Sequence, residues 1–61
     1  MKIKVEYKSD ILGSGVFWEG DASEINEIRN IPARETAKIV IKDGAGSARK
    51  CGMWLVSALD D

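Results

Sequence analysis

The chain has no histidine, one cysteine (Cys51) and one proline (Pro32) in 61 residues. A lone thiol cannot form an intrachain disulfide and is typical of a reducing compartment. A structural zinc site would have to rest on carboxylates, which such sites rarely do. Acid–base catalysis near neutral pH relies mainly on histidine. The sequence therefore predicts a non-catalytic protein with no metal and no cofactor.

Long apolar runs are also missing. The longest, Met53–Val56, is far shorter than the roughly 20 residues that cross a bilayer. The amino terminus alternates charged and apolar residues and offers no apolar core for a secretion signal. We therefore expect one domain, spanning 1–61, that is cytoplasmic and does not enter a membrane. A domain this small buries only about 60% of its unfolded surface, so association with another chain would reinforce it.

One short helix is predicted near the middle of the chain. Asp21 and Glu24 have the spacing of a capping box, in which each side chain satisfies a free backbone N–H of the first helical turn. Apolar residues then recur every third position, at Ala22, Ile25 and Ile28. Pro32 disfavours the helical conformation of the residue before it. We expect the helix to start after Asp21 and to end before the proline.

Four segments have the pattern of β-strands. Strict alternation over 2–8 predicts a half-buried strand, and turn residues separate it from a second strand at 16–19. The β-branched segment 36–42 and the apolar run 51–59 enclose the glycine-rich segment 43–47, which indicates a hairpin. The order β-β-α-β-β predicts an α+β fold, a small, mostly antiparallel four-stranded sheet with one short helix packed on one face.

The glycine-rich segment 44–50 superficially resembles a phosphate-binding loop. Arg49 stands where the dinucleotide fingerprint needs a third glycine, and Cys51 stands where the P-loop needs a hydroxyl residue. Both motifs also require a helix next, whereas an apolar strand is expected here. We interpret the segment as a hairpin loop, with an anion site at Arg49 and Lys50 as the alternative. Cys51 is interpreted as a small structural side chain, because no general base accompanies it.

The last predicted strand is apolar on both of its faces. One short helix can cover only one face of the sheet, so large side chains must point to the other. We expect Met53 and Leu55 beneath the helix, together with Ile3, Val5, Ile39 and Ile41. The predicted partner-binding residues on the opposite face are Val40, Trp54 and Val56. Alternatively Ile11, Leu12, Phe17 or Trp18 folds over this patch and buries it.

Basic residues form a second candidate surface. The outward positions of the first and third predicted strands share one sheet face and, with an aromatic ring, would suit single-stranded nucleic acid. The candidate contacts are Lys2, Lys4, Lys8, Lys38, Lys42, Arg49 and Lys50. A solvated lysine face is the ordinary alternative, because lysines also protect sheet edges from aggregation.

The leading hypothesis is a small protein-binding module that docks on a partner protein or forms a homodimer. In size and in its lack of catalytic machinery, the chain is similar to accessory and inhibitor proteins of phages and other mobile elements. The alternative is a nucleic-acid-binding module that uses the lysine-rich face. Steep loss of affinity with salt would distinguish nucleic-acid binding from protein binding.

Overall fold

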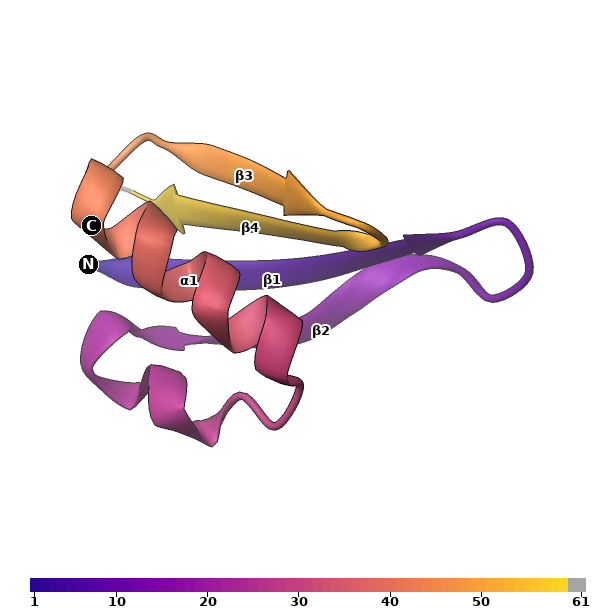
Figure 1. The fold of residues 1–61 in the computed structure, drawn as a ribbon, viewed down its shortest axis with the longest axis horizontal. Helices are drawn as coiled ribbons and strands as arrows, with labels where there is room; N and C mark the ends of the chain where they lie inside the picture. The colour runs from indigo at the N-terminus through magenta and orange to yellow at the C-terminus, as the bar shows by residue number, and fades with distance from the viewer. Residues whose placement is uncertain (60–61) are drawn as a thin grey trace.

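The structure is a computed structural model that describes residues 1–59, so the acidic pair at 60–61 lies outside the described residues. Two strands come first, then a short 3-10 helix, an α-helix and two further strands (Figure 1). In order, the elements are β1 (Lys2–Ser9), β2 (Gly13–Asp21), η1 (Ala22–Glu27), α1 (Ile31–Asp43), β3 (Ala48–Cys51) and β4 (Trp54–Leu59).

The strands form one antiparallel sheet in the order β2-β1-β4-β3. Helix α1 crosses one face of this sheet, and no described element covers the opposite face (Figure 1). The α+β class, the β-β-α-β-β order and the single-sided helix are thus confirmed. The core lies between α1 and the sheet and consists of Ile3, Val5, Ile28, Ala33, Ala37, Val40, Val56 and Ala58.

The β1–β2 hairpin extends beyond the rest of the sheet as an arm (Figure 1). Pairing of β1 with β4 ends at Tyr7, whereas pairing of β1 with β2 continues to Ser9 and Gly13. A register shift between Val5 and Glu6 leaves Phe17 as an extra residue in β2, the signature of a β-bulge. A bulge bends its strand, so the end of the arm departs from the line of the sheet.

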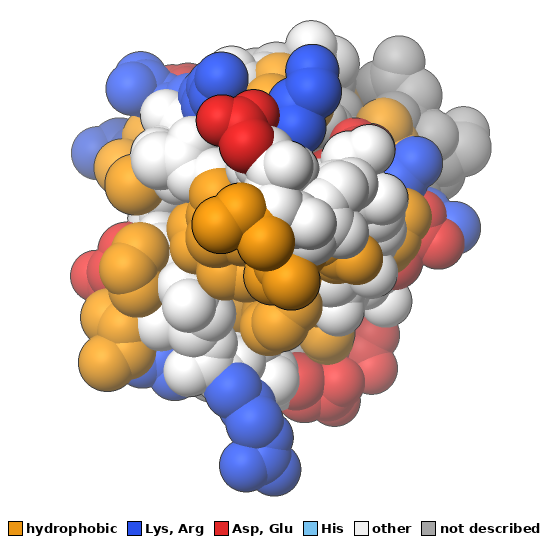
Figure 2. Space-filling view, turned by 90° about the vertical axis from the view of Figure 1, so that its right-hand side faces the viewer, with side chains coloured by type: hydrophobic (Ala, Val, Ile, Leu, Met, Phe, Trp, Pro, Cys, Tyr) orange, Lys and Arg blue, Asp and Glu red, His pale blue; other side chains and the backbone are white. Residues whose placement is uncertain are grey.

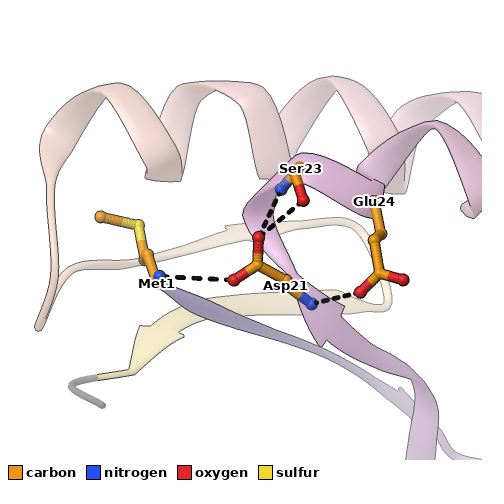
Figure 3. Close-up of polar contacts among 4 residues, drawn as sticks. All are labelled: Met1, Asp21, Ser23 and Glu24. Atoms are coloured by element: carbon orange, nitrogen blue, oxygen red, sulfur yellow. Dashed lines mark hydrogen bonds and ion pairs between the residues drawn. The ribbon is translucent and has the colours of Figure 1, made fainter.

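The helix predicted after Asp21 is only the six-residue 3-10 helix η1. The capping box itself is present: the Asp21 carboxylate accepts hydrogen bonds from the Ser23 amide (3.0 Å) and hydroxyl (2.7 Å), and Glu24 accepts one from the Asp21 amide (3.1 Å) (Figure 3). The Met1 amino group lies 3.5 Å from the Asp21 carboxylate. Ile28 then takes an extended conformation that ends the element.

The strand predicted at 36–42 is wrong, because this segment lies inside the α-helix α1. Ala33, Ala37 and Val40 are spaced three and four residues apart, and all three are buried against the sheet. The run Ile39–Ile41 favours a strand by local propensity, but packing of this face on the sheet outweighs that weak preference.

Pro32 was expected to follow the end of the only helix, but it lies at the beginning of α1. Pro32 stands in the first turn of α1, where its missing N–H would have no helical partner in any case. The Asn30 side chain caps the same turn by accepting a hydrogen bond from the Ala33 amide at 3.0 Å. Residues 30 and 32 therefore begin the main helix and do not end one.

The predicted register of the last strand is reversed. Val5 lies directly opposite Val56 and Tyr7 opposite Trp54, so these side chains share the face that α1 covers. Val56 is fully buried, whereas Leu55 points to the uncovered face. Val40, predicted on that outer face, is fully buried in α1. The run 51–59 is also not one strand, since a turn at 52–53 separates β3 from β4.

Candidate docking surface

The uncovered face of the sheet carries two exposed aliphatic side chains on either side of Glu6. Val16 of β2 and Leu55 of β4 both lie opposite Glu6, and they are 53% and 39% exposed. At the base of the arm a shallow hollow of about 150 Å³ is lined by Glu6, Tyr7, Lys8, Ser14 and Leu55. Apolar surface and a small recess therefore adjoin on the same face.

The tip of the arm presents the most exposed large hydrophobic residues of the described chain. Ile11 is 93% and Leu12 74% exposed. The Ser9 hydroxyl accepts hydrogen bonds from both of their amides, at 3.2 and 3.1 Å, and so holds the turn in shape. Figure 2 shows hydrophobic side chains gathered at this end of the molecule. Met53, also exposed, lies beside the arm, with its carbonyl accepting a hydrogen bond from the Lys8 amide at 2.8 Å.

Charges of both signs surround this apolar surface. Lys2 and Glu19 form an ion pair at 3.4 Å, and Lys4 lies opposite Glu19 across the β1–β2 pair. Glu6 lies between the two aliphatic side chains, and Lys50 faces Leu55 from β3. The face therefore mixes cations, carboxylates and aliphatic groups. We call this face, together with the arm tip, the docking surface; it comprises Ile11, Leu12, Val16 and Leu55 with their charged neighbours.

The predicted partner-binding residues are not on the docking surface. Val40 and Val56 are buried in the core, so the expectation that they are exposed is wrong. Trp54 lies on the helix side, where its ring packs against Phe17 at a centroid distance of 4.7 Å. Leu55 takes the outward position that was expected for its neighbours. On the uncovered face Leu55 is 39% exposed, whereas Trp54 and Val56 lie on the covered face.

From the sequence, Ile11 and Leu12 were expected only as residues that could fold over the apolar face of the sheet and bury it. They lie in the sequence Asp10-Ile-Leu-Gly13, between turn-forming residues. Two large apolar residues at a turn position are a signal that could have been weighed as an exposed tip. Nothing in the sequence shows that β1 and β2 outrun the other strands, which is what removes these residues from the core.

The seven predicted nucleic-acid contacts are divided between the two sides of the molecule. Lys38 and Lys42 lie on α1, and Arg49 pairs with Asp43 at 3.0 Å. The Trp54 ring lies on the covered side of the sheet and cannot join the lysines of the other face. Four lysines do share the uncovered face, by their register in the sheet: Lys2, Lys4, Lys8 and Lys50.

The glycine-rich segment is a helix-to-strand connection and not a hairpin loop. The Ser47 hydroxyl donates to the carbonyls of Val40 and Gly44 at the end of α1, at 3.1 and 2.6 Å. Carbonyl groups at a helix carboxyl end disfavour an anion. The anion site considered at Arg49 and Lys50 therefore has little geometric basis. Cys51 is exposed in β3.

Neighbouring groups lower the pKa of Asp21 and of Glu35, and both carboxyl groups lie outside the docking surface's apolar centre. Hydrogen bonds from Ser23, helped by the amino terminus, lower the pKa of Asp21. A hydrogen bond from Lys38 and its charge lower the pKa of Glu35 on α1. These hydrogen bonds and charges stabilise the carboxylate form, so the two groups are not prepared to donate protons. Their electrostatics are those of caps and surface pairs.

Over 1–59, no three His, Cys, Asp or Glu side chains gather closely enough to hold a metal ion. No helix in that range has the length and hydropathy needed to cross a membrane. Comparison with known proteins adds no relative: no protein-family model matches the chain, and no curated protein and no solved structure matches it significantly.

Proposed function

We propose that this chain is a protein-binding module that associates with a second copy of itself through the docking surface. The observation that carries the proposal is the exposure of Ile11 and Leu12 on a structured arm, next to the uncovered sheet face. Contiguous exposed apolar surface on a small domain usually marks an interaction site. A chain that buries little surface in its own fold also gains most from such an association.

The size of the surface suits a dimer. Stable interfaces remove about 800 Å² from each partner, which is roughly a fifth of this chain's 4031 Å² of accessible surface. The broad side of the molecule measures 31 × 21 Å, so one side has an area of this order. The uncovered sheet face and the arm lie along that side (Figure 1).

The charges and the small hollow of the docking surface suit a second copy of the chain as the partner. In a two-fold dimer each patch meets the same patch, so a surface with both signs of charge can pair its own lysines with its own carboxylates. Lys4 and Glu19, adjacent across β1 and β2, provide such a mixed pattern. The hollow beside Leu55, at about 150 Å³, has the volume of a cavity that takes benzene, and so has room for one aliphatic side chain from the second copy's arm.

Light scattering after gel filtration tests the proposal. We expect the unmodified protein to have the mass of a dimer at micromolar concentration and the double variant Ile11→Ser, Leu12→Ser to have the mass of a monomer. Ile39→Ser is the control, because Ile39 is also an exposed aliphatic residue, at 44%, but lies on α1, away from the docking surface. Circular dichroism checks that each variant is folded. A monomeric unmodified protein, or a dimer that survives the double substitution, would refute the proposal.

Nucleic-acid binding remains the second candidate, supported by the four lysines of the uncovered face. Glu6 and Glu19 on the same face and the absence of an aromatic ring among its described positions weaken it. Gel retardation of single- and double-stranded DNA and RNA at low salt tests it. Retardation that disappears in Lys4→Ala and Lys50→Ala and weakens steeply with salt would favour this candidate. Unretarded nucleic acid would eliminate it.

A further inference from the structure

A wide, open hollow lies on the other side of the sheet from the docking surface. It has a volume of about 720 Å³ and opens between β2, η1 and the beginning of α1. Its lining residues are Trp18, Asn26, Glu27, Arg29 and Arg34. Sites for small organic ligands have volumes of about 300–1,000 Å³, so this hollow is large enough for one such molecule.

The fold fixes the aromatic wall of this hollow. Trp18 lies opposite Val5 on the covered face of the sheet, and its indole ring passes over Gly20. A Cβ atom at position 20 would lie only 2.7 Å from the ring, so glycine is what allows this close approach. The ring is half-buried and packed against the core. Its position is therefore set before any ligand arrives, which lowers the entropic cost of stacking on it.

Burial of Ile28 positions one of the two arginines. Ile28 is fully buried between η1 and α1, so the core fixes the backbone on either side of it. Its neighbours Glu27 and Arg29 are exposed and line the hollow. Arg34 is half-buried near the start of α1. The two guanidinium groups thus come from the connection after η1 and from α1, and the core holds the backbone of both segments in place.

Neither Arg29 nor Arg34 forms an ion pair with any residue in the range 1–59. Glu35, beside Arg34, is held instead by Lys38 at 2.8 Å. Arg49, in contrast, is paired with Asp43. A guanidinium group has five N–H donors in a planar fork that matches phosphate or carboxylate oxygens. The hollow therefore has donors that the protein itself leaves unused.

The beginning of α1 contributes little to an anion in this hollow. Pro32 has no N–H, and the Ala33 amide is already bonded to Asn30. The positive charge of the hollow comes from its two arginine side chains, partly offset by Glu27. Charge and planar aromatic surface together distinguish this hollow from an ordinary surface recess.

We propose that the hollow binds a mononucleotide, with the base against the indole of Trp18 and the phosphate on Arg29 and Arg34. Stacking on an aromatic side chain is available to every base. At the edge of a base, the Asn26 amide can donate and accept hydrogen bonds, and the Glu27 carboxylate can accept them. This site is independent of self-association, because its residues lie on the helix side of the sheet.

Tryptophan fluorescence tests the proposal in a Trp54→Phe background, where Trp18 is the only tryptophan. The probes are AMP and GMP, with adenosine and inorganic phosphate as the two halves of the ligand. We expect saturable quenching by AMP or GMP and weaker binding of each half. Arg29→Ala or Arg34→Ala should raise the Kd by about tenfold or more, because each removes charge-assisted hydrogen bonds. Arg49→Ala, the same exchange outside the hollow, should leave the Kd unchanged.

Isothermal titration of the unmodified protein with AMP and GMP provides a second measurement that needs no substitution. Absence of binding by both nucleotides at millimolar concentration would overturn the proposal. Inorganic phosphate binding as tightly as AMP would overturn the role of Trp18. An equal loss of affinity in the Arg49→Ala variant would show that general surface charge, and not this hollow, attracts the ligand.

Discussion

Exchange of Val40 for alanine is the sharpest test of the helical register of α1. Val40 is fully buried against the sheet, whereas its neighbour Ile39 is 44% exposed. Val40→Ala removes two buried methyl groups, about 1.6 kcal/mol of transfer free energy, and the cavity left behind brings the cost to about 2–3 kcal/mol. The higher helix propensity of alanine returns roughly half a kcal/mol. We expect a net loss of about 2 kcal/mol.

That loss is large for this chain. At roughly 0.05–0.15 kcal/mol per residue, a domain of this size has an unfolding free energy of about 3–9 kcal/mol. In a domain of this size 1 kcal/mol moves the Tm by about 4–8 °C, so Val40→Ala should lower the Tm by about 8–16 °C. Ile39→Ala should cost less than about 1 kcal/mol, because half of its side chain is already in water.

Urea unfolding followed by circular dichroism measures both variants under identical conditions. A strand at 36–42 would place Ile39 in the core and Val40 on the surface, and so would reverse the order of the two losses. An Ile39→Ala variant that loses as much stability as Val40→Ala would therefore refute the helical assignment and the core that depends on it.

Three further predictions follow from the caps and from the sheet. Asn30→Ala should destabilise the protein by about 1 kcal/mol in urea unfolding, because it removes the cap of α1. Asp21 has a lower pKa in the folded chain than in the unfolded one. Its contribution to stability is therefore complete above a pH of about 4 and disappears as the pH falls through the folded pKa. In an acid titration, the stability of Asp21→Asn should depend less on pH than that of the unmodified protein. Gly20→Ala should cost about 1–3 kcal/mol, because its Cβ would clash with the Trp18 ring, and an unchanged Tm would contradict that contact.

The β1 strand and the capping box could be read directly from local sequence. Alternation over 2–8 predicts which side chains of β1 face the core, because Ile3, Val5 and Tyr7 share one face of the strand, and Ile3 and Val5 are fully buried there. The spacing of Asp21 and Glu24 predicts their hydrogen bonds, since both partners lie within one turn. The α+β class followed from the same short-range patterns.

The segment from Ile31 to Asp43 was misread because its local signals conflict. Its β-branched residues favour a strand, whereas Ala33, Ala37 and Val40 have helical spacing. Only the sheet, which presents a flat apolar face of the right length, decides between these patterns. The register of the last strand was a separate error, because both of its faces are apolar and local sequence alone does not show which one the helix covers.

The candidate sites depend on tertiary structure more strongly than the fold does. Arg29 and Arg34 meet Trp18 only because Ile28 enters the core between η1 and α1, and no spacing in the sequence predicts that meeting. Ile11 and Leu12 are exposed only because β1 and β2 outrun β4.

By itself the sequence determined the α+β class, the first strand, the capping box and the lack of histidine chemistry, because these depend on composition and on contacts between near neighbours. The tertiary structure decided which of two apolar faces is buried, where the arm projects and which charges come together. Those outcomes depend on contacts between residues far apart in the chain, whose energies exceed the local preferences that a sequence displays.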